Sequence, residues 1–394
     1  MNLRRSLVFA FAPLLLAAAA RAESTVEERL KALEQQVQKL SQENTELKKE
    51  LGWKEGATPP VVPRPGGKET KLIVGGFLQG HAEFGRAPDP RWSGVKDRFF
   101  FRRARIYLAG TIATDFDFKA ELDLQGNTLS AGTGQLARAN EIYLGWHRYA
   151  FANLRFGQIK PAYGAEQLAS DLYIPVIERY LASDRLADGR QLGVSVGGQL
   201  LDKKVSYLAV VGNGNGANVS GNDNSKFQRS ARVAFTPLAT PDDKLVFGVN
   251  GLWADDTGLA KSNLGLTGNL FTGTRTQWGA DAEWTHGPLG LSAEWLGATF
   301  KPVNAVPAAS FDAEGWHATA TYFVVPRTLQ AVVRREAFDP NTALGGDTIR
   351  TWTFGLNYLI KGDDLKLMVD WLDGRVPGAT NDGGRLLTRL QVVF

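Results

Sequence analysis

The chain has 394 residues, with 45 basic and 41 acidic side chains, 43% apolar residues and no cysteine. The lack of cysteine excludes a disulfide framework and any cysteine-based zinc or redox site. The 22% of charged and 10% of aromatic residues exclude a disordered or low-complexity chain.

Residues 1–22 have the pattern of a secretory signal peptide. Arg4 and Arg5 precede an apolar run of 14 residues from Leu7 to Ala20, and Ala20-Arg21-Ala22 supplies a small-x-small cleavage site. A membrane-spanning helix needs about 20 apolar residues, so this run is too short for one. Cleavage would remove three arginines and leave 42 bases against 41 acids. The overall charge then gives no reason to expect nucleic acid as a partner.

Residues 23–53 are predicted to form a periplasmic coiled-coil helix, because apolar residues follow a heptad with strict 3-4 spacing. A Pro/Gly-rich linker, residues 54–70, would hold this helix away from the rest of the chain. An amphipathic helix packed on its own protein is the alternative. Asn44 occupies an a position and would fix the register without choosing two or three strands. The core positions are Val26, Leu30, Leu33, Val37, Leu40, Asn44, Leu47 and Leu51.

From about Leu72 to the end, apolar and polar residues alternate with a period of two, which predicts β-strands. Long connections alternate with tight turns, as in an outer-membrane barrel. The fold class is therefore all-β, a 16-stranded antiparallel transmembrane β-barrel over residues 71–394, preceded by the short coiled-coil helix. The predicted strands are 72–86, 98–113, 115–126, 138–147, 151–160, 190–200, 203–213, 226–237, 244–254, 274–285, 288–299, 313–324, 328–337, 348–359, 364–373 and 385–394.

Tryptophan placement separates a membrane barrel from a soluble one. Three strands each carry two aromatic residues six positions apart on their apolar face, with Ala or other small to medium residues between them. Such spacing brackets an apolar band about 25 Å tall between two aromatic girdles. Small residues facing lipid cost little, whereas a soluble core would place larger residues there. The pairs are Trp278 and Trp284, Trp316 and Tyr322, and Trp352 and Tyr358.

A barrel of about sixteen strands leaves an aqueous lumen. The strand parity points nine basic and nine acidic side chains into it, so the wall alone favours neither ion sign. These charges could instead pair across strands and stiffen the wall. The connection 161–189 is too long for a surface turn and is predicted to fold inward as a constriction loop. An outer loop packed against neighbouring subunits is the alternative.

The sequence contains no clear pattern of catalytic residues. The four histidines lie in separate strands or turns without metal-ligand spacing, and no Ser/His/Asp grouping stands out. We therefore expect no enzyme activity, no metal site and no cofactor.

Several segments in the first third of the barrel resemble the phosphate-selective porin O/P family of bacterial outer membranes. They are Phe101-Arg102-Arg103-Ala104-Arg105-Ile106, the segment LRFGQIKPAYGAE at 154–166, Ile177-Glu178-Arg179, and Arg190-Gln191-Leu192-Gly193-Val194. The resemblance implies a homotrimeric porin whose third loop narrows the lumen and whose basic residues guide anions. The pore-lining or anion-binding candidates that it implies are Arg103, Arg105, Arg155, Lys160, Arg179, Arg185 and Arg190.

The predicted function is passive diffusion of small hydrophilic solutes across the bacterial outer membrane, with anions such as phosphate or polyphosphate as permeants. A non-selective general porin and an envelope-tethering protein that uses its coiled coil are the alternatives. The predicted partners are outer-membrane lipid, small anions, two further copies of the chain and the cell wall, the last through residues 23–53; no nucleic acid is expected.

Overall fold

The computed structural model describes residues 71–125, 137–259, 271–303, 310–379 and 383–394, together with isolated helical positions at Lys31, Gln35, Gln38 and Lys39. The predicted signal peptide, the linker and nearly all of the coiled-coil segment lie outside these described residues. The chain divides into two compact units, Met1–Val62 and Pro63–Phe394. Among the described residues, no helix has the length and apolar character needed to cross a membrane.

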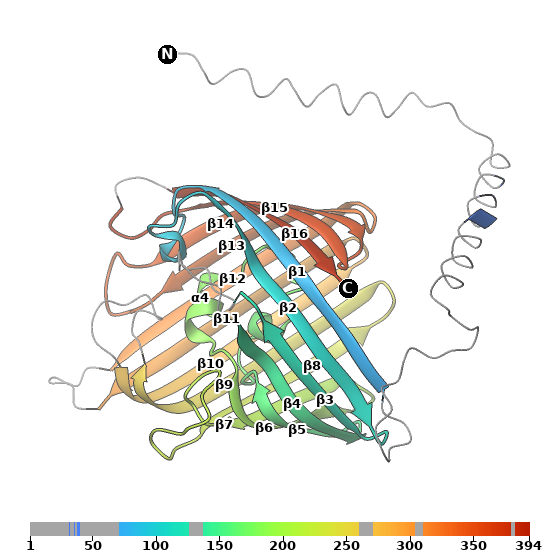
Figure 1. Ribbon diagram of the computed structural model, residues 1–394. Helices are drawn as coiled ribbons and strands as arrows, with labels where there is room; N and C mark the ends of the chain where they lie inside the picture. Colours follow the sequence, from blue (N-terminus) through green and yellow to red (C-terminus); the bar gives the residue numbers. More distant parts are fainter. Residues whose placement is uncertain are drawn as a thin grey trace. The chain divides into compact units, whose positions relative to one another are not determined.

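Sixteen antiparallel strands form one closed barrel, in which each strand pairs with its sequence neighbours and β1 pairs with β16 (Figure 1). All sixteen predicted strands are present, so the predicted barrel is confirmed. The strands are β1 (Lys71–Gly85), β2 (Arg98–Ile112), β3 (Phe116–Asp123), β4 (Arg138–Tyr149), β5 (Ala152–Ile159), β6 (Gln191–Leu200), β7 (Val205–Gly212), β8 (Gln228–Ala239), β9 (Asp243–Leu259), β10 (Phe271–His286), β11 (Leu289–Pro302), β12 (Phe311–Val325), β13 (Leu329–Asp339), β14 (Ile349–Lys361), β15 (Leu365–Gly374) and β16 (Gly383–Val393).

Several strands extend beyond their predicted bounds, and the paired ends of β9 and β10 are a clear case. β9 continues to Leu259 and β10 begins at Phe271, where the sequence placed a long connection over 255–273. Polar residues such as Asp255 and Asp256 interrupt the apolar pattern there, but they still pair across the ladder with Thr274 and Gly273. Strand pairing depends on backbone hydrogen bonds, so it persists beyond the apolar band that the sequence pattern detects.

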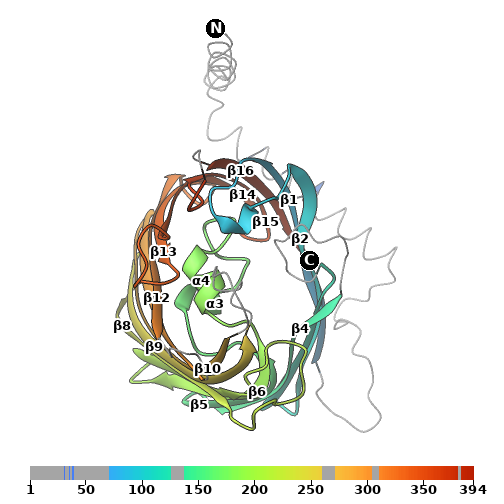
Figure 2. The same ribbon diagram turned by 90° about the vertical axis from the view of Figure 1, so that its left-hand side faces the viewer.

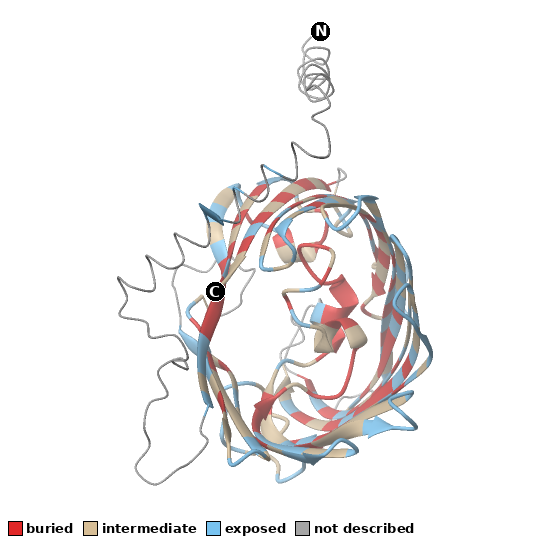
Figure 3. Ribbon diagram, turned by 90° about the vertical axis from the view of Figure 1, so that its right-hand side faces the viewer, coloured by how far each residue is buried: buried red, intermediate tan, exposed pale blue. Residues whose placement is uncertain are grey.

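The two faces of the wall differ as the strand parity predicts. In β3, Phe116 and Leu122 are about half exposed on the outside, whereas Glu121 and Asp123 point inward and are buried. The six girdle residues named above lie on the outward face, and most of them are exposed. Figure 3 shows the resulting alternation of buried and exposed residues along the strands. An apolar outer wall and a polar inner wall are what a barrel in lipid requires.

The lumen is partly filled by two connections that enter it, and Figure 2 shows this in a view along the barrel. The connection between β5 and β6 carries α3 (Ala165–Leu168) and α4 (Leu181–Leu186), which lies against β11, β12 and β13. The connection between β1 and β2 carries the short 3₁₀ helix η1 (Pro90–Trp92). We call residues 161–189 the constriction loop and residues 86–97 the first loop.

Apolar side chains on the inner wall hold the constriction loop in place. Tyr163, Tyr180 and Leu181 of the loop pack with Leu252 and Phe338 of the wall in one buried cluster. Gly315 of β12 allows the closest approach, because a Cβ at this position would lie 2.4 Å from the Cβ of Ala182. The loop is therefore packed against one side of the barrel as part of its core.

Candidate pore and constriction site

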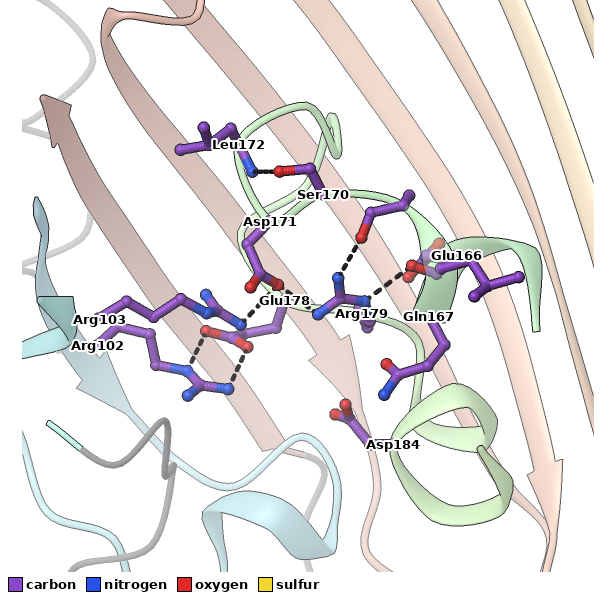
Figure 4. Close-up of polar contacts among 12 residues, drawn as sticks. Arg102, Arg103, Glu166, Gln167, Ser170, Asp171, Leu172, Glu178, Arg179 and Asp184 are labelled. Atoms are coloured by element: carbon purple, nitrogen blue, oxygen red, sulfur yellow. Dashed lines mark hydrogen bonds and ion pairs between the residues drawn. The ribbon is translucent and has the colours of Figure 1, made fainter. Parts of the chain in front are cut away.

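Every acidic side chain of the constriction loop forms an ion pair with an arginine. Asp171 is the most heavily paired: its carboxylate lies 2.5 Å from Arg179, 2.8 Å from Arg105 and 3.2 Å from Arg103. Figure 4 shows Asp171 between Arg179 and Arg103. All four side chains are buried. Burial alone would raise the pKa of Asp171, but Arg103, Arg179 and Arg105 outweigh it and hold the pKa well below its usual range.

The other four loop acids bind arginines of the barrel wall or of the first loop. Glu178 forms two hydrogen bonds with Arg102, at 2.9 and 3.0 Å, and also contacts Arg389. Arg334 holds Glu166 at 2.6 Å, and against the effect of burial it lowers the pKa of Glu166 to about 2. The remaining pairs are Asp184 with Arg91 at 2.6 Å and Asp188 with Arg275 at 2.9 Å. The negative charge of the loop is thus neutralised within the protein.

The first loop also contacts the constriction loop and helps to hold it in place. The Arg91 guanidinium donates to Asp89 at 2.9 Å, to Asp184 at 2.6 Å and to the carbonyl of Arg179 at 2.6 Å. Next to it, Trp92 is buried in a cluster with Ile177 of the constriction loop and three residues of β15 and β16. No pattern in the sequence predicts this inward position of the first loop.

Arg91→Met should loosen the contact between the two loops. Removing one partner from a buried ion pair costs about 3–5 kcal/mol, because the other charge stays buried without compensation. We expect a larger single-channel conductance and stronger current fluctuations in a planar bilayer. The exposed Arg86 of the same loop supplies the control: Arg86→Met should leave both quantities unchanged. Equal traces for Arg91→Met and the unmodified protein would contradict this role.

A cavity of about 620 Å³ remains open between the constriction loop and the opposite wall, which is built mainly by β1 to β8. Six basic side chains and three acidic ones line it. The bases are Arg105, Lys119, Arg155, Lys160, Arg190 and Arg232, and the acids are Glu121, Glu141 and Asp171. The lining of this cavity is therefore positively charged overall.

Three of these six bases are bound to carboxylates. Lys119 lies 2.8 Å from Glu121 and 2.9 Å from Glu141. Arg105 binds Asp123 and Asp171, and Arg232 binds Asp281 through two hydrogen bonds. Ion pairs of this kind leave little net field at the cavity surface.

The other three bases are freer to act on an ion in the cavity. Arg155 is exposed, stacks 4.5 Å above the ring of Tyr143, and binds no carboxylate in the described part of the chain. In the part of the chain that the structure describes, Lys160 donates only to the main-chain carbonyls of Gln167, Leu168 and Ala169. Arg190 lies 4.0 Å from Glu141, and its Nε has no hydrogen-bond partner among the same residues. These three side chains form the candidate anion site.

Four of the seven candidate residues thus line the open cavity: Arg105, Arg155, Lys160 and Arg190. Arg103 and Arg179 instead bind Asp171 behind the loop, and Arg185 lies on α4 away from the cavity lining. The candidate set omitted Lys119 and Arg232, which strand parity had already pointed into the lumen. The role of all these residues in anion binding stays a prediction.

The charge of Lys160 should depend on pH near neutrality. Burial, followed by the positive charges of Arg179 and Arg190, lowers its pKa to about 7. The ammonium is therefore charged below about pH 7 and neutral above it, so anion selectivity should fall as pH rises through this value. The reversal potential under a KCl gradient, measured from about pH 6 to about pH 8, checks this. Lys160→Met should remove most of the pH dependence, and an unchanged profile in that variant would contradict the assignment.

Comparisons with known proteins show the family of this chain and relatives with the same fold. The sequence model of the family "Phosphate-selective porin O and P" matches residues 78–394. Porin O of Pseudomonas aeruginosa is 26% identical over 401 residues, covering 83% of this chain and 89% of that protein.

Solved structures of low sequence identity have the same fold. The outer membrane channel DcaP of Acinetobacter baumannii has a TM-score of 0.58 at 14% identity, covering 82% of this chain and 97% of its own. An anion-selective porin from Comamonas acidovorans has a TM-score of 0.57 at 11% identity, with coverages of 83% and 100%. The trimer form of OmpT of Vibrio cholerae has a TM-score of 0.56 at 14% identity, with coverages of 83% and 100%.

Proposed function

This chain belongs to the phosphate-selective porin O and P family, and we propose on that basis that it is a bacterial outer-membrane porin through which small anions, phosphate among them, diffuse passively. The family and the fold neighbours point to a channel rather than to an enzyme. The ions would pass through the open cavity beside the constriction loop.

One observation carries the anion preference. Within the described residues, the cavity presents Arg155, Lys160 and Arg190 without close carboxylate partners, while each of the five loop acids is paired with an arginine. A few uncompensated charges at a narrow point set the selectivity of a wide barrel. The acidic excess of the loop, which in the sequence argues against anions, is therefore consistent with an anion channel.

The reversal potential of the purified mature protein in a planar bilayer under a KCl gradient tests this proposal. We expect a chloride-preferring current that added phosphate or pyrophosphate reduces. A current that is equally permeable to both ions and insensitive to phosphate would favour the general porin. A protein that folds as a barrel but does not conduct would contradict the channel itself.

We further propose the domain plan that the sequence predicts. Residues 1–22 would direct export, and residues 23–53 would form a coiled coil in the periplasm, joined by the linker 54–70 to the barrel at residues 71–394. Both barrel termini lie at the edge that carries the tight turns, which supports a periplasmic position for that edge. The trimeric neighbour supports a homotrimer. Deleting residues 23–67 would assign a tethering or assembly role to the helix if trimers or cell-wall contact were lost while conductance persisted.

A further inference from the structure

A groove of about 450 Å³ crosses the outer wall of the barrel between β9 and β14. Its floor follows one cross-strand row, in which Ala282 pairs with Ala293, Ala293 with Ala318, and Ala318 with Arg335. The row ends at Trp352, directly opposite Arg335. Three methyl side chains in succession leave a depression that ends at a charged residue.

Large apolar side chains border this row on both sides. Trp295 and Trp316, each 41% exposed, pair with each other in the adjacent row toward the long loops. Trp284 and Leu291 pair in the adjacent row toward the tight turns. The alanine floor is therefore flanked by apolar rows that lie four residue positions apart along a strand, of which the row with Trp284 and Leu291 lines the groove.

Two outward arginines lie together at one end of the groove. The guanidinium of Arg335 stacks 5.0 Å from the centre of the Trp352 ring. Arg350 lies on the same face, opposite Ala337, and is a diagonal neighbour of Arg335. Diagonal neighbours in a sheet lie about 7–8 Å apart, and both side chains are long enough to meet at one anion. Within the described residues neither arginine has a carboxylate partner, although unpaired charge on a lipid-facing wall is unfavourable.

The groove runs obliquely through the height of the wall. Ala282 lies four residues from the tight-turn end of β10 at His286, whereas Arg335 lies six residues from the corresponding end of β13 at Leu329. Arg350 is the second residue of β14 at its long-loop end. The arginine end is thus the end nearer the long loops, and the alanine end lies nearer the tight turns.

We propose that this groove binds a phosphorylated lipid of the outer leaflet, with the phosphate at Arg335 and Arg350 and an acyl chain along Ala318, Ala293 and Ala282. This rests on the proposed placement of the barrel in the outer membrane. Arginine pairs bind phosphate through charge-assisted hydrogen bonds. Trp352, at the level of the aromatic girdle, places the pair where lipid headgroups begin. The apolar groove leads from there toward the membrane interior, as an acyl chain would.

Native mass spectrometry of the full mature protein tests this proposal, with phosphorylated lipid A, dephosphorylated lipid A and inorganic phosphate as the probes. We expect the phosphorylated lipid to bind and Arg335→Gln/Arg350→Gln to bind it about twentyfold more weakly, since each basic residue near an anionic lipid contributes about fivefold. Ala318→Phe should also weaken binding by filling the groove while both arginines remain. Arg229→Gln is the matched control, because Arg229 of β8 lies opposite the outward Trp253 of β9 and outside the groove.

Three results would overturn the proposal: equal lipid binding by the double arginine variant, equal binding of dephosphorylated lipid, or capture of inorganic phosphate alone. A fourth result would also overturn the proposal: the double arginine variant loses an oligomer but still binds the lipid. This face of the barrel would then bind a second copy of the chain. Because both arginines lie outside the lumen, the conductance of the double variant should be unchanged. A failure of the channel proposal would appear in the bilayer recordings, and a failure of the lipid proposal in the mass spectra.

Discussion

Asp171→Asn is expected to release the constriction loop while the barrel stays intact. The carboxylate of Asp171 is 5% exposed and contacts Arg103, Arg105 and Arg179. Without it, three buried guanidiniums face one another, and breaking such a buried pair costs about 3–5 kcal/mol. The sixteen strands are held by their own backbone ladders, so this loss should fall on the loop. Local opening should become more frequent by a factor of roughly a hundred or more.

Limited trypsin digestion measures this opening, because Arg179 and Arg185 of the loop become cleavage sites once the loop leaves the wall. Heat-modifiable migration on a denaturing gel reports whether the barrel is still folded. Asp255→Asn serves as the control, since Asp255 forms an exposed pair with Lys226 and such surface pairs contribute about 0–1 kcal/mol. If the Asp171 variant resisted trypsin as the unmodified protein does, the ion pairs would not be what holds the loop.

The barrel could be predicted from the sequence because its signal is local. A strand in a membrane wall needs only alternating faces, and the residues that reveal this are two positions apart, as Phe116, Phe118 and Ala120 are in β3. Tight turns then fix every second pair of neighbours in the closed sheet, and the alternating long connections join the pairs. The strand count, the strand order and the outward position of the tryptophans all follow from these short-range patterns.

The constriction could be predicted only in outline, because its contacts join distant parts of the chain. Asp171 and Arg105 are separated by 66 residues, Glu166 and Arg334 by 168, and Glu178 and Arg389 by 211. A count of nine bases against nine acids treats all wall charges alike. In the structure Arg334 and Arg389 neutralise loop acids, whereas Arg155 keeps its charge available to the cavity.

The first loop had no comparable signal. Its inward position depends on a pocket for Trp92 that Ile177, Met368 and Leu387 form together, and on the carboxylate of Asp184 for Arg91. None of these partners is close to it in the sequence. The presence of Trp92 in a short polar connection is nevertheless a weak signal that the first loop packs inward. A tryptophan in a loop outside the membrane girdles rarely stays exposed without a partner.

The triple variant Arg155→Gln, Lys160→Gln, Arg190→Gln should abolish the anion preference of the channel. It would leave three bases against three acids around the cavity, and each remaining base, Arg105, Lys119 and Arg232, already binds a carboxylate. With no uncompensated charge left, the ratio of chloride to potassium permeability should fall to about one. The reversal potential under a KCl gradient measures this ratio directly.

The same variant separates charge from loop position as the origin of selectivity. Arg155 and Arg190 form no close ion pair with the constriction loop within the described residues, whereas Lys160 donates to three of its main-chain carbonyls. Arg155→Gln/Arg190→Gln, which keeps these hydrogen bonds, should therefore lower the anion preference while trypsin resistance stays near that of the unmodified protein. Arg185→Gln removes one positive charge from α4, outside the cavity lining, and should keep the anion preference. If Arg185→Gln lowered the selectivity as much as the triple variant does, the long-range field of the whole loop would govern permeation. If the triple variant still preferred anions, the arginines bound to Asp171 and Asp281 would have to act on the ion despite their pairing, and the candidate site would be wrong.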